Sequence, residues 1–276
     1  MDKNKVVYFA VTSILLFLLY TALSYVPFVS LFLPFLIVGL SCAVTNKTNY
    51  KYGITTLLLS FVYFSFVLKF NLENIVSATL YLMLGIIISE LVDRKSNKST
   101  LLLVTAIVFI GIYASLFVYQ SAKVGHNIFV TEINKFIDEY IVFLTNSLKT
   151  TELSENVSVV EQYVRNMANM TINLFPSMII IGSAVVSYVV LCFSSLFMKI
   201  YKCKNQFIPH FSTFKIDTVT SFVYFVSVIM SVFLNNEILL IVFMNIYTII
   251  QFSLIVCGFS IFDFLEFLQP DFVLKW

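Results

Sequence analysis

Charged residues are scarce in this 276-residue chain: Asp, Glu, Lys and Arg make up 12% of it, against 59% hydrophobic residues. A soluble domain usually carries about 25% charged and about 45–50% apolar residues. The mean hydropathy of +0.94 agrees with this excess, and a globule of this size cannot bury so much apolar surface. The shortage of charge excludes soluble enzymes, nucleic-acid-binding proteins and disordered regulators. We therefore expect an integral membrane protein surrounded by the lipid bilayer.

Glycine, histidine and paired cysteines are also rare. The chain has seven glycines and four cysteines, and no two cysteines form a C-x-x-C pair, so no disulfide framework or zinc motif is indicated. The two histidines, His126 and His210, fall in segments that we predict on opposite sides of the membrane. Signatures of nucleotide-binding loops, zinc hydrolases and serine hydrolases are absent. The sequence thus predicts no catalytic residue, no metal, no cofactor and no ATPase of its own.

Eight apolar runs are long enough to cross a bilayer, which takes about 20 helical residues. They are residues 6–23, 26–44, 53–70, 75–92, 101–119, 172–198, 219–234 and 238–262. None alternates with a period of two, so we predict an all-α integral membrane protein with about eight transmembrane helices. Pro27 and Pro34 leave open whether the second run forms a full span or a broken helix.

Lysine and arginine residues predict the orientation of these spans. With the N-terminus in the cytoplasm, 12 of the 17 basic residues fall on the inner side, as the positive-inside rule requires. An even number of spans then places the C-terminus in the cytoplasm as well. In this topology residues 120–170 form the one long external segment.

Apolar residues in that external segment recur at helical spacing, which predicts two amphipathic helices joined near residues 149–154. We expect Ile133, Ile137, Tyr140 and Leu144 to face the bundle or lipid, and the wet side to carry Asp138, Glu139 and Glu161. The hairpin either shields the bundle or forms a lid over an external cavity. It divides the chain into a five-span half (1–119), the hairpin (120–171) and a three-span half (172–276).

Polar residues inside the last three spans are the candidates for binding a solute. Asn245, Thr248 and Gln251 cover about one third of the circumference of the last helix, and the sixth span carries Ser183 and Ser187. These groups either join neighbouring helices by hydrogen bonds or line a polar cavity for a small molecule. The sequence leaves both interpretations open.

Glu90 is the one carboxylate well inside an apolar run, and intramembrane charges are functional candidates by default. It also lies one turn from Asp93, Arg94 and Lys95, where it reaches the membrane interface. An ion pair with Arg94 at i,i+4 is geometrically available. Glu90 is therefore either a structural partner of Arg94 or a coupling residue.

The order of features in the last three spans resembles that of a known family. The features are Pro176 at the start of the sixth span, Ser187-Tyr188 within it, the inner loop 207–215, Asn245, Gln251-Phe252 and the ending 257–262. The early Pro27 and Pro34 and the amphipathic hairpin add to the likeness. The chain resembles the YybS-like family of uncharacterised multi-spanning bacterial membrane proteins, which implies a bacterial cytoplasmic membrane.

The N-terminal half is similar to substrate-binding (S) components of energy-coupling-factor transporters. Such components capture a vitamin or metal from outside and dock on a membrane coupling subunit with its ATPases, so the resemblance implies those partners. Two features depart from that pattern. S components often carry two alanines four residues apart on the first helix, whereas this chain has Ala10 followed by Ser13 and Ile14. The second departure is eight spans rather than six.

Two functional hypotheses follow. The first is a transport-related component that binds a small solute from the outer face. The alternative is a non-transporting membrane scaffold or assembly factor in envelope growth or sporulation. An intramembrane enzyme is the least favoured reading, because no span supplies a nucleophile with a base or paired carboxylates.

Overall fold

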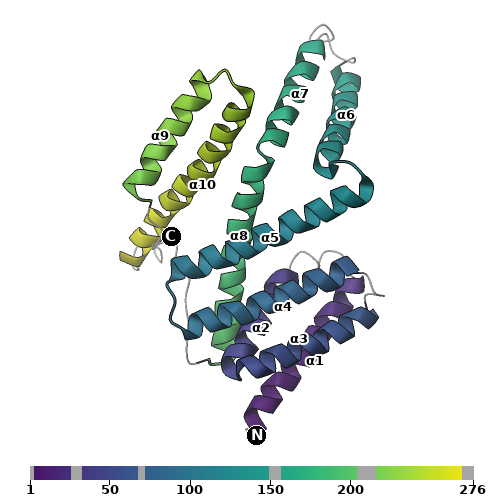
Figure 1. The fold of residues 1–276 in the computed structure, drawn as a ribbon, viewed down its shortest axis with the longest axis vertical. Coiled ribbons are helices and arrows are strands. Elements are labelled where there is room, and N and C mark those ends of the chain that lie inside the picture. Colours follow the sequence, from purple (N-terminus) through teal and green to yellow (C-terminus); the bar gives the residue numbers. More distant parts are fainter. Residues whose placement is uncertain (1–2, 26–32, 68–71, 149–156, 204–215, 269–276) are drawn as a thin grey trace. The chain divides into compact units, whose positions relative to one another are not determined.

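The computed structural model describes residues 3–25, 33–67, 72–148, 157–203 and 216–268 (Figure 1). Within these ranges the chain forms ten α-helices and no strand, as the composition predicts. The helices are α1 Lys3–Tyr25, α2 Leu33–Lys47, α3 Tyr50–Val67, α4 Leu72–Asp93, α5 Lys98–Val124, α6 Ile128–Leu148, α7 Val157–Asn173, α8 Phe175–Ile200, α9 Thr218–Phe233 and α10 Glu237–Leu268.

Local sequence signals explain several helix boundaries. Pro34 and Pro176 stand at the second positions of α2 and α8, where a missing backbone N–H costs nothing. Asp217 caps the start of α9, and its Oδ1 accepts a hydrogen bond from the Thr220 N–H at 2.9 Å. Pro27 and the connection between α6 and α7 lie outside the described residues. The question of a broken second span therefore stays open.

Three helices of the described chain are long and apolar enough to cross a membrane: Lys98–Val124, Phe175–Ile200 and Glu237–Phe259. They correspond to the predicted spans at 101–119, 172–198 and 238–262. Shorter apolar helices occupy Lys5–Leu16 and Thr218–Phe233. The structure confirms an all-helical membrane protein. The prediction of eight spans goes beyond the three helices that are long and apolar enough to cross a membrane.

The helices group into two compact units. The first comprises Met1–Ile112 and Gly182–His210, and the second comprises Tyr113–Ile181 and Phe211–Trp276. The first unit therefore holds α1 to α4, the beginning of α5 and most of α8. The second holds the end of α5, α6, α7, the first turns of α8, α9 and α10. This grouping follows packing rather than chain order, and the three-part division of the sequence remains a prediction.

In the first unit, α2 packs directly against α4. The Ser41 hydroxyl donates to the Leu82 carbonyl at 2.9 Å, and a Cβ added at Gly85 would come within 2.6 Å of the Val38 oxygen. Gly85 thus permits a backbone approach that no larger residue allows. A second close approach joins α2 to α8, where Gly39 lies under the ring of Phe197. Glycine is scarce in this chain but is used at these two crossings.

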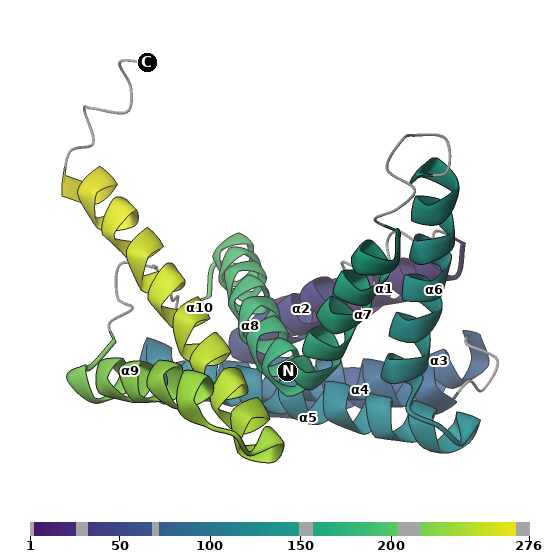
Figure 2. The same cartoon turned by 90° about the horizontal axis from the view of Figure 1, so that it is seen from above.

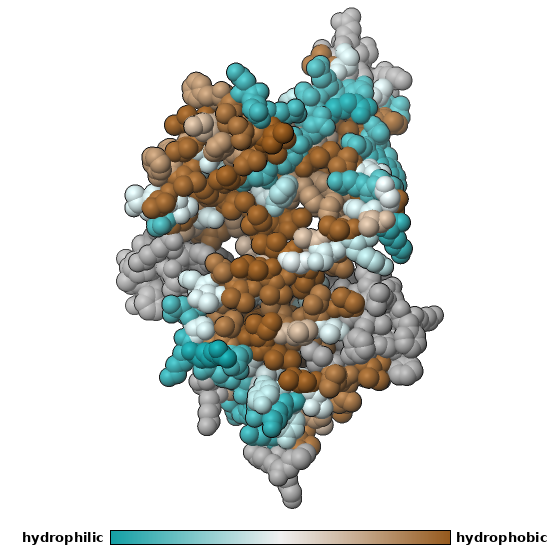
Figure 3. Space-filling view, viewed as in Figure 1, coloured by the Kyte–Doolittle hydropathy of each residue, from teal (hydrophilic) through white to brown (hydrophobic). Residues whose placement is uncertain are grey.

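In the second unit, two helix pairs lie side by side in both ribbon views: α6 with α7 and α9 with α10 (Figures 1 and 2). The rings of Tyr224 and Tyr247 join α9 to α10 with centroids 5.8 Å apart. The space-filling view shows apolar side chains over α9 and α10 (Figure 3). Such a surface suits contact with lipid rather than water.

Candidate functional site

Asn245 of α10 is the most highly connected of the predicted site residues. Its Oδ1 accepts a hydrogen bond from the Ser177 N–H at 2.9 Å, and its Nδ2 donates to the Asn173 carbonyl at 2.8 Å. Nδ2 also lies 2.9 Å from the Ile241 carbonyl in its own helix. Asn173 ends α7 and Ser177 lies in the first turn of α8, where backbone groups lack partners within their own helix. One amide therefore caps the end of α7 and the start of α8.

The other two polar residues of α10 are placed differently. The Thr248 hydroxyl donates to the Met244 carbonyl of its own helix at 2.7 Å. Gln251 is exposed, a position that suits contact with solvent, headgroups or a further chain. Asn245, Thr248 and Gln251 belong to the second compact unit. Of the three, Asn245 is the one whose hydrogen bonds reach other helices among the described residues.

Ser183 and Ser187 of α8 lie in the first compact unit, so the structure assigns the two predicted sets to different units. Both serines are fully buried, as is Ser194 two turns further along α8. The Ser187 hydroxyl donates to the Ser183 carbonyl at 2.6 Å. The Ser183 hydroxyl, by contrast, makes no hydrogen bond with a described residue, and the same holds for the buried Ser89 of α4. The first unit thus buries hydroxyl groups whose hydrogen-bonding capacity is unused.

Glu90 forms the ion pair that its spacing predicts. Its Oε1 lies 3.0 Å from Arg94 Nε, and both side chains are more than half exposed. An exposed i,i+4 pair stabilises a helix only slightly. The geometry is that of a structural ion pair at the end of α4, while the interfacial position and the coupling role of Glu90 remain predictions.

A polar network that sequence reasoning missed surrounds the same end of the first unit. Asn46 Nδ2 donates to Asp93 Oδ1 at 2.7 Å, and Lys47 Nζ donates to the Lys202 carbonyl at 2.9 Å. The Lys47 ammonium also lies 5.3 Å from the centre of the Tyr8 ring. This network joins α1, α2 and α4 to the turn after α8. Each residue lies in a different segment of the sequence, so spacing alone gave no sign of it.

A second buried contact supports this network from within the unit. The Thr12 and Tyr201 hydroxyls lie 2.7 Å apart, and Thr12 also donates to the Tyr8 carbonyl. Nearby, Cys42 Sγ lies 3.7 Å from Met198 Sδ, and Cys203 Sγ lies 3.6 Å from the Ala43 carbonyl. Burial raises the pKa of the Cys203 thiol to about 11. Both cysteines behave as small apolar residues in this packing.

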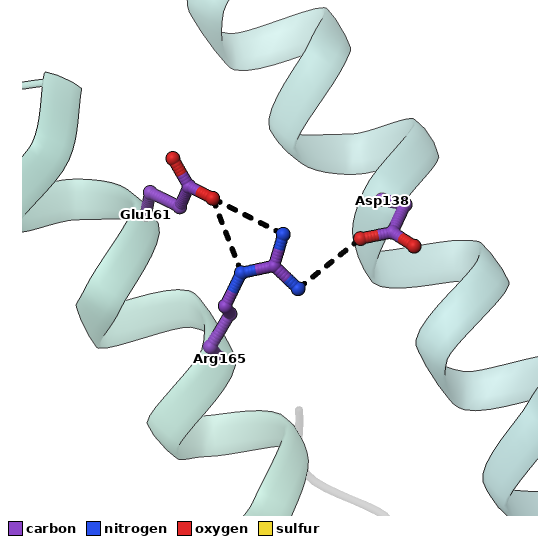
Figure 4. A network of polar contacts seen from close by, with 3 residues as sticks. All are labelled: Asp138, Glu161 and Arg165. Atoms are coloured by element: carbon purple, nitrogen blue, oxygen red, sulfur yellow. Dashed lines mark hydrogen bonds and ion pairs between the residues drawn. The ribbon is translucent and has the colours of Figure 1, made fainter.

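Arg165 connects the two helices of the predicted hairpin (Figure 4). Its guanidinium lies 3.1 Å from Glu161 of α7 and 3.2 Å from Asp138 of α6. The hydrogen bond to Glu161 raises the pKa of Arg165 above its already high value. Asp138 and Glu139 are exposed, as predicted, and Glu161 is half-buried. Ile133, Ile137 and Leu144 are half-buried, whereas Tyr140, predicted on the covered side with them, is 43% exposed. The location of this helix pair outside the membrane remains a prediction.

No group of three or more His, Cys, Asp or Glu side chains in the described ranges could hold a metal ion. His126 is exposed, and His210 lies outside those ranges. The expectation that the chain needs no metal or cofactor therefore stays a prediction.

Comparison with known proteins identifies a family and nothing narrower. Residues 11–266 match the family model described as "Predicted membrane protein (DUF2232)". This covers nearly the whole chain, and the protein belongs to that family. No curated protein and no solved structure matches the chain.

Proposed function

We propose that this protein is a transport-related membrane component that binds a small polar solute from the outer face and has no ATPase or catalytic activity of its own. Within its family of membrane proteins, this proposal follows the resemblance to the YybS-like family, in which the N-terminal half is similar to an S component. The partners implied are a membrane coupling subunit and its ATPases. No nucleic acid is expected to bind.

The buried hydroxyls of the first unit carry the proposal. Ser183, Ser187 and Ser194 lie on one face of α8, all fully buried, and Ser183 has no hydrogen-bond partner among the described residues. Buried polar groups are nearly always satisfied by protein, water or a ligand. A binding site needs a few such groups in an otherwise apolar surrounding. Ser183 and Ser187 are therefore our first candidates for contacting the solute.

The residues on α10 remain candidates for binding the solute, but they differ in how many of their polar atoms are already hydrogen-bonded. Asn245 already uses both polar atoms of its amide to cap α7 and α8. Thr248 and Gln251 keep more hydrogen-bonding capacity and belong to the second unit. Glu90, at the exposed end of α4, is the candidate for coupling to a partner.

The proposed topology has eight spans in a bacterial cytoplasmic membrane, with both termini in the cytoplasm and α6 and α7 outside. The first unit brings together six helical segments: α1 to α4 with parts of α5 and α8. Six is the number of spans that the resemblance to S components implies. The helices α6, α7, α9 and α10 belong to the second unit, and the likeness to S components is proposed for the N-terminal half alone.

The test uses the full chain purified in a mild detergent, followed by mass spectrometry of the small molecules that stay bound. Ser183→Ala removes the buried hydroxyl without adding volume, so stability should be unchanged or raised while the retained solute is lost. Ser115→Ala is the matched control, because Ser115 lies on α5 and is exposed. Equal solute in wild type and Ser183→Ala, or no solute in wild type, would refute the proposal.

Exposed aromatic residues on the helix pair favour the scaffold as the second candidate. Phe136 and Phe143 of α6 and Tyr163 of α7 are each about two-thirds exposed. Such side chains suit a protein or membrane contact. A purified complex that contains a stoichiometric protein partner, holds no solute and dissociates in a Phe136→Ser, Phe143→Ser variant would favour the scaffold.

A further inference from the structure

Two lysines adopt a backbone conformation that normally requires glycine. Lys95 has φ of 56° and Lys202 has φ of 50°, and they are the non-glycine residues with positive φ in the described chain. In this region the Cβ of an L-residue crowds the backbone, which is why glycine usually occupies it. The two positions are equivalent, since each follows the last turn of a helix.

The hydrogen bonds show the same cap at both sites. After α4, the Ser96 N–H donates to the Leu91 carbonyl and the Lys95 N–H to the Val92 carbonyl, both at 3.0 Å. After α8, the Cys203 N–H donates to the Met198 carbonyl at 2.9 Å and the Lys202 N–H to the Lys199 carbonyl at 3.0 Å. This is the Schellman pattern, whose left-handed position most often carries glycine.

Both caps lie beside the end of α2. Asn46 bonds to Asp93 beside the first cap, and the next residue, Lys47, bonds to the Lys202 carbonyl within the second. Both lysine side chains are exposed, and neither forms an ion pair with a described residue. The structure therefore places two strained lysines at one end of the first unit.

Further basic residues surround them. The basic patch consists of Lys47, Lys51, Arg94, Lys95, Lys98, Lys199 and Lys202. The acidic residues among them are Glu90 and Asp93, so the patch carries a surplus of five positive charges. Hydrophilic side chains gather over this end of the unit in the space-filling view (Figure 3). Candidate spans begin at Lys98 and end at Ile200, so we expect the patch at the level of the lipid headgroups.

We propose that the basic patch binds the phosphate of anionic phospholipid headgroups, with Lys95 and Lys202 as the recognition residues. Backbone strain persists at functional sites when the side chain it carries is needed. Glycine would stabilise both caps but would supply no charge. A lysine near an anionic membrane surface contributes about a five-fold gain in affinity. This site goes beyond the proposed solute site and shares none of its residues.

The test titrates the full chain in a neutral detergent with phosphatidylglycerol or phosphatidylcholine and counts bound lipids by native mass spectrometry. Wild type should prefer phosphatidylglycerol. The variant Lys95→Gly, Lys202→Gly should bind it about 25-fold more weakly, because two charges each worth about five-fold are lost. The same variant should melt at an equal or higher temperature, because glycine relieves the strain. Lys95→Arg, Lys202→Arg should retain the lipid.

Lys123→Ala, Lys135→Ala is the matched control, because it removes two exposed lysines from the second unit. It should bind phosphatidylglycerol as wild type does. Three results would overturn the proposal: wild-type binding by the glycine variant, equal weakening by the control variant, or full displacement of the lipid by equimolar inorganic phosphate. The last result would identify a free anion as the ligand.

Discussion

Replacing Asn245 with leucine tests whether this amide holds the second unit together. The change removes the hydrogen bonds to Ser177 and Asn173 and leaves a backbone N–H and a carbonyl without partners. Hydrogen bonds between helices in membranes contribute about 0.6 kcal/mol on average and up to about 1.7 kcal/mol each. Two such bonds therefore predict a loss of about 1 to 3 kcal/mol.

The assay is reversible unfolding in mixed micelles with increasing dodecyl sulfate, followed by far-ultraviolet circular dichroism. Thr248→Val is the matched control, since Thr248 lies one turn away on α10 and its hydroxyl bonds within its own helix. The control should unfold at the wild-type midpoint. If Asn245→Leu also unfolds there, the capping role is refuted. If Asn245→Leu loses the bound solute but keeps the wild-type stability, Asn245 is a solute-binding residue and not a structural one.

The remaining predictions concern packing, pH and thiol chemistry. Gly85→Ala should destabilise the protein, because the new Cβ meets the Val38 oxygen. Gly111→Ala should be neutral or stabilising, because no atom lies within 4 Å of the new Cβ. Thermal melts of the two variants test this difference. Hydrogen bonds from the Thr220 hydroxyl and then from the Thr220 backbone N–H lower the pKa of Asp217, so the cap stabilises the fold above the unfolded pKa of about 3.9. That stability should be lost as the pH falls through the lower folded pKa, and Asp217→Asn should abolish the dependence in acid melts. Burial raises the pKa of Cys203 to about 11, so maleimide should label this thiol slowly from pH 7 to 9 until detergent unfolds the protein.

Local features of the fold could be predicted from the sequence, because their determinants lie within one turn. The pairing of Glu90 with Arg94 follows from spacing alone. The all-helical membrane class follows from the surplus of apolar residues. The helix α5 is longer than the span predicted at residues 101–119, and it continues through polar residues to Val124.

The candidate site could be predicted only as a set of residue types. The partners of Asn245 lie 68 and 72 residues away, so no local pattern reveals them. The caps at Lys95 and Lys202 were missed for a different reason. The usual signal for such a cap is glycine, and the sequence has lysine at both positions.

The order of synthesis gives the packing of α2 a further consequence. Its contacts with α8 include Gly39 under Phe197 and Cys42 beside Met198. The ribosome makes 69 residues, Tyr113 to Ile181, between the two parts of this unit. At about 5–20 residues per second this takes about 3 to 14 seconds. During that interval nascent α2 lacks its neighbour, so lipid or the insertion machinery must cover the face that α8 later occupies.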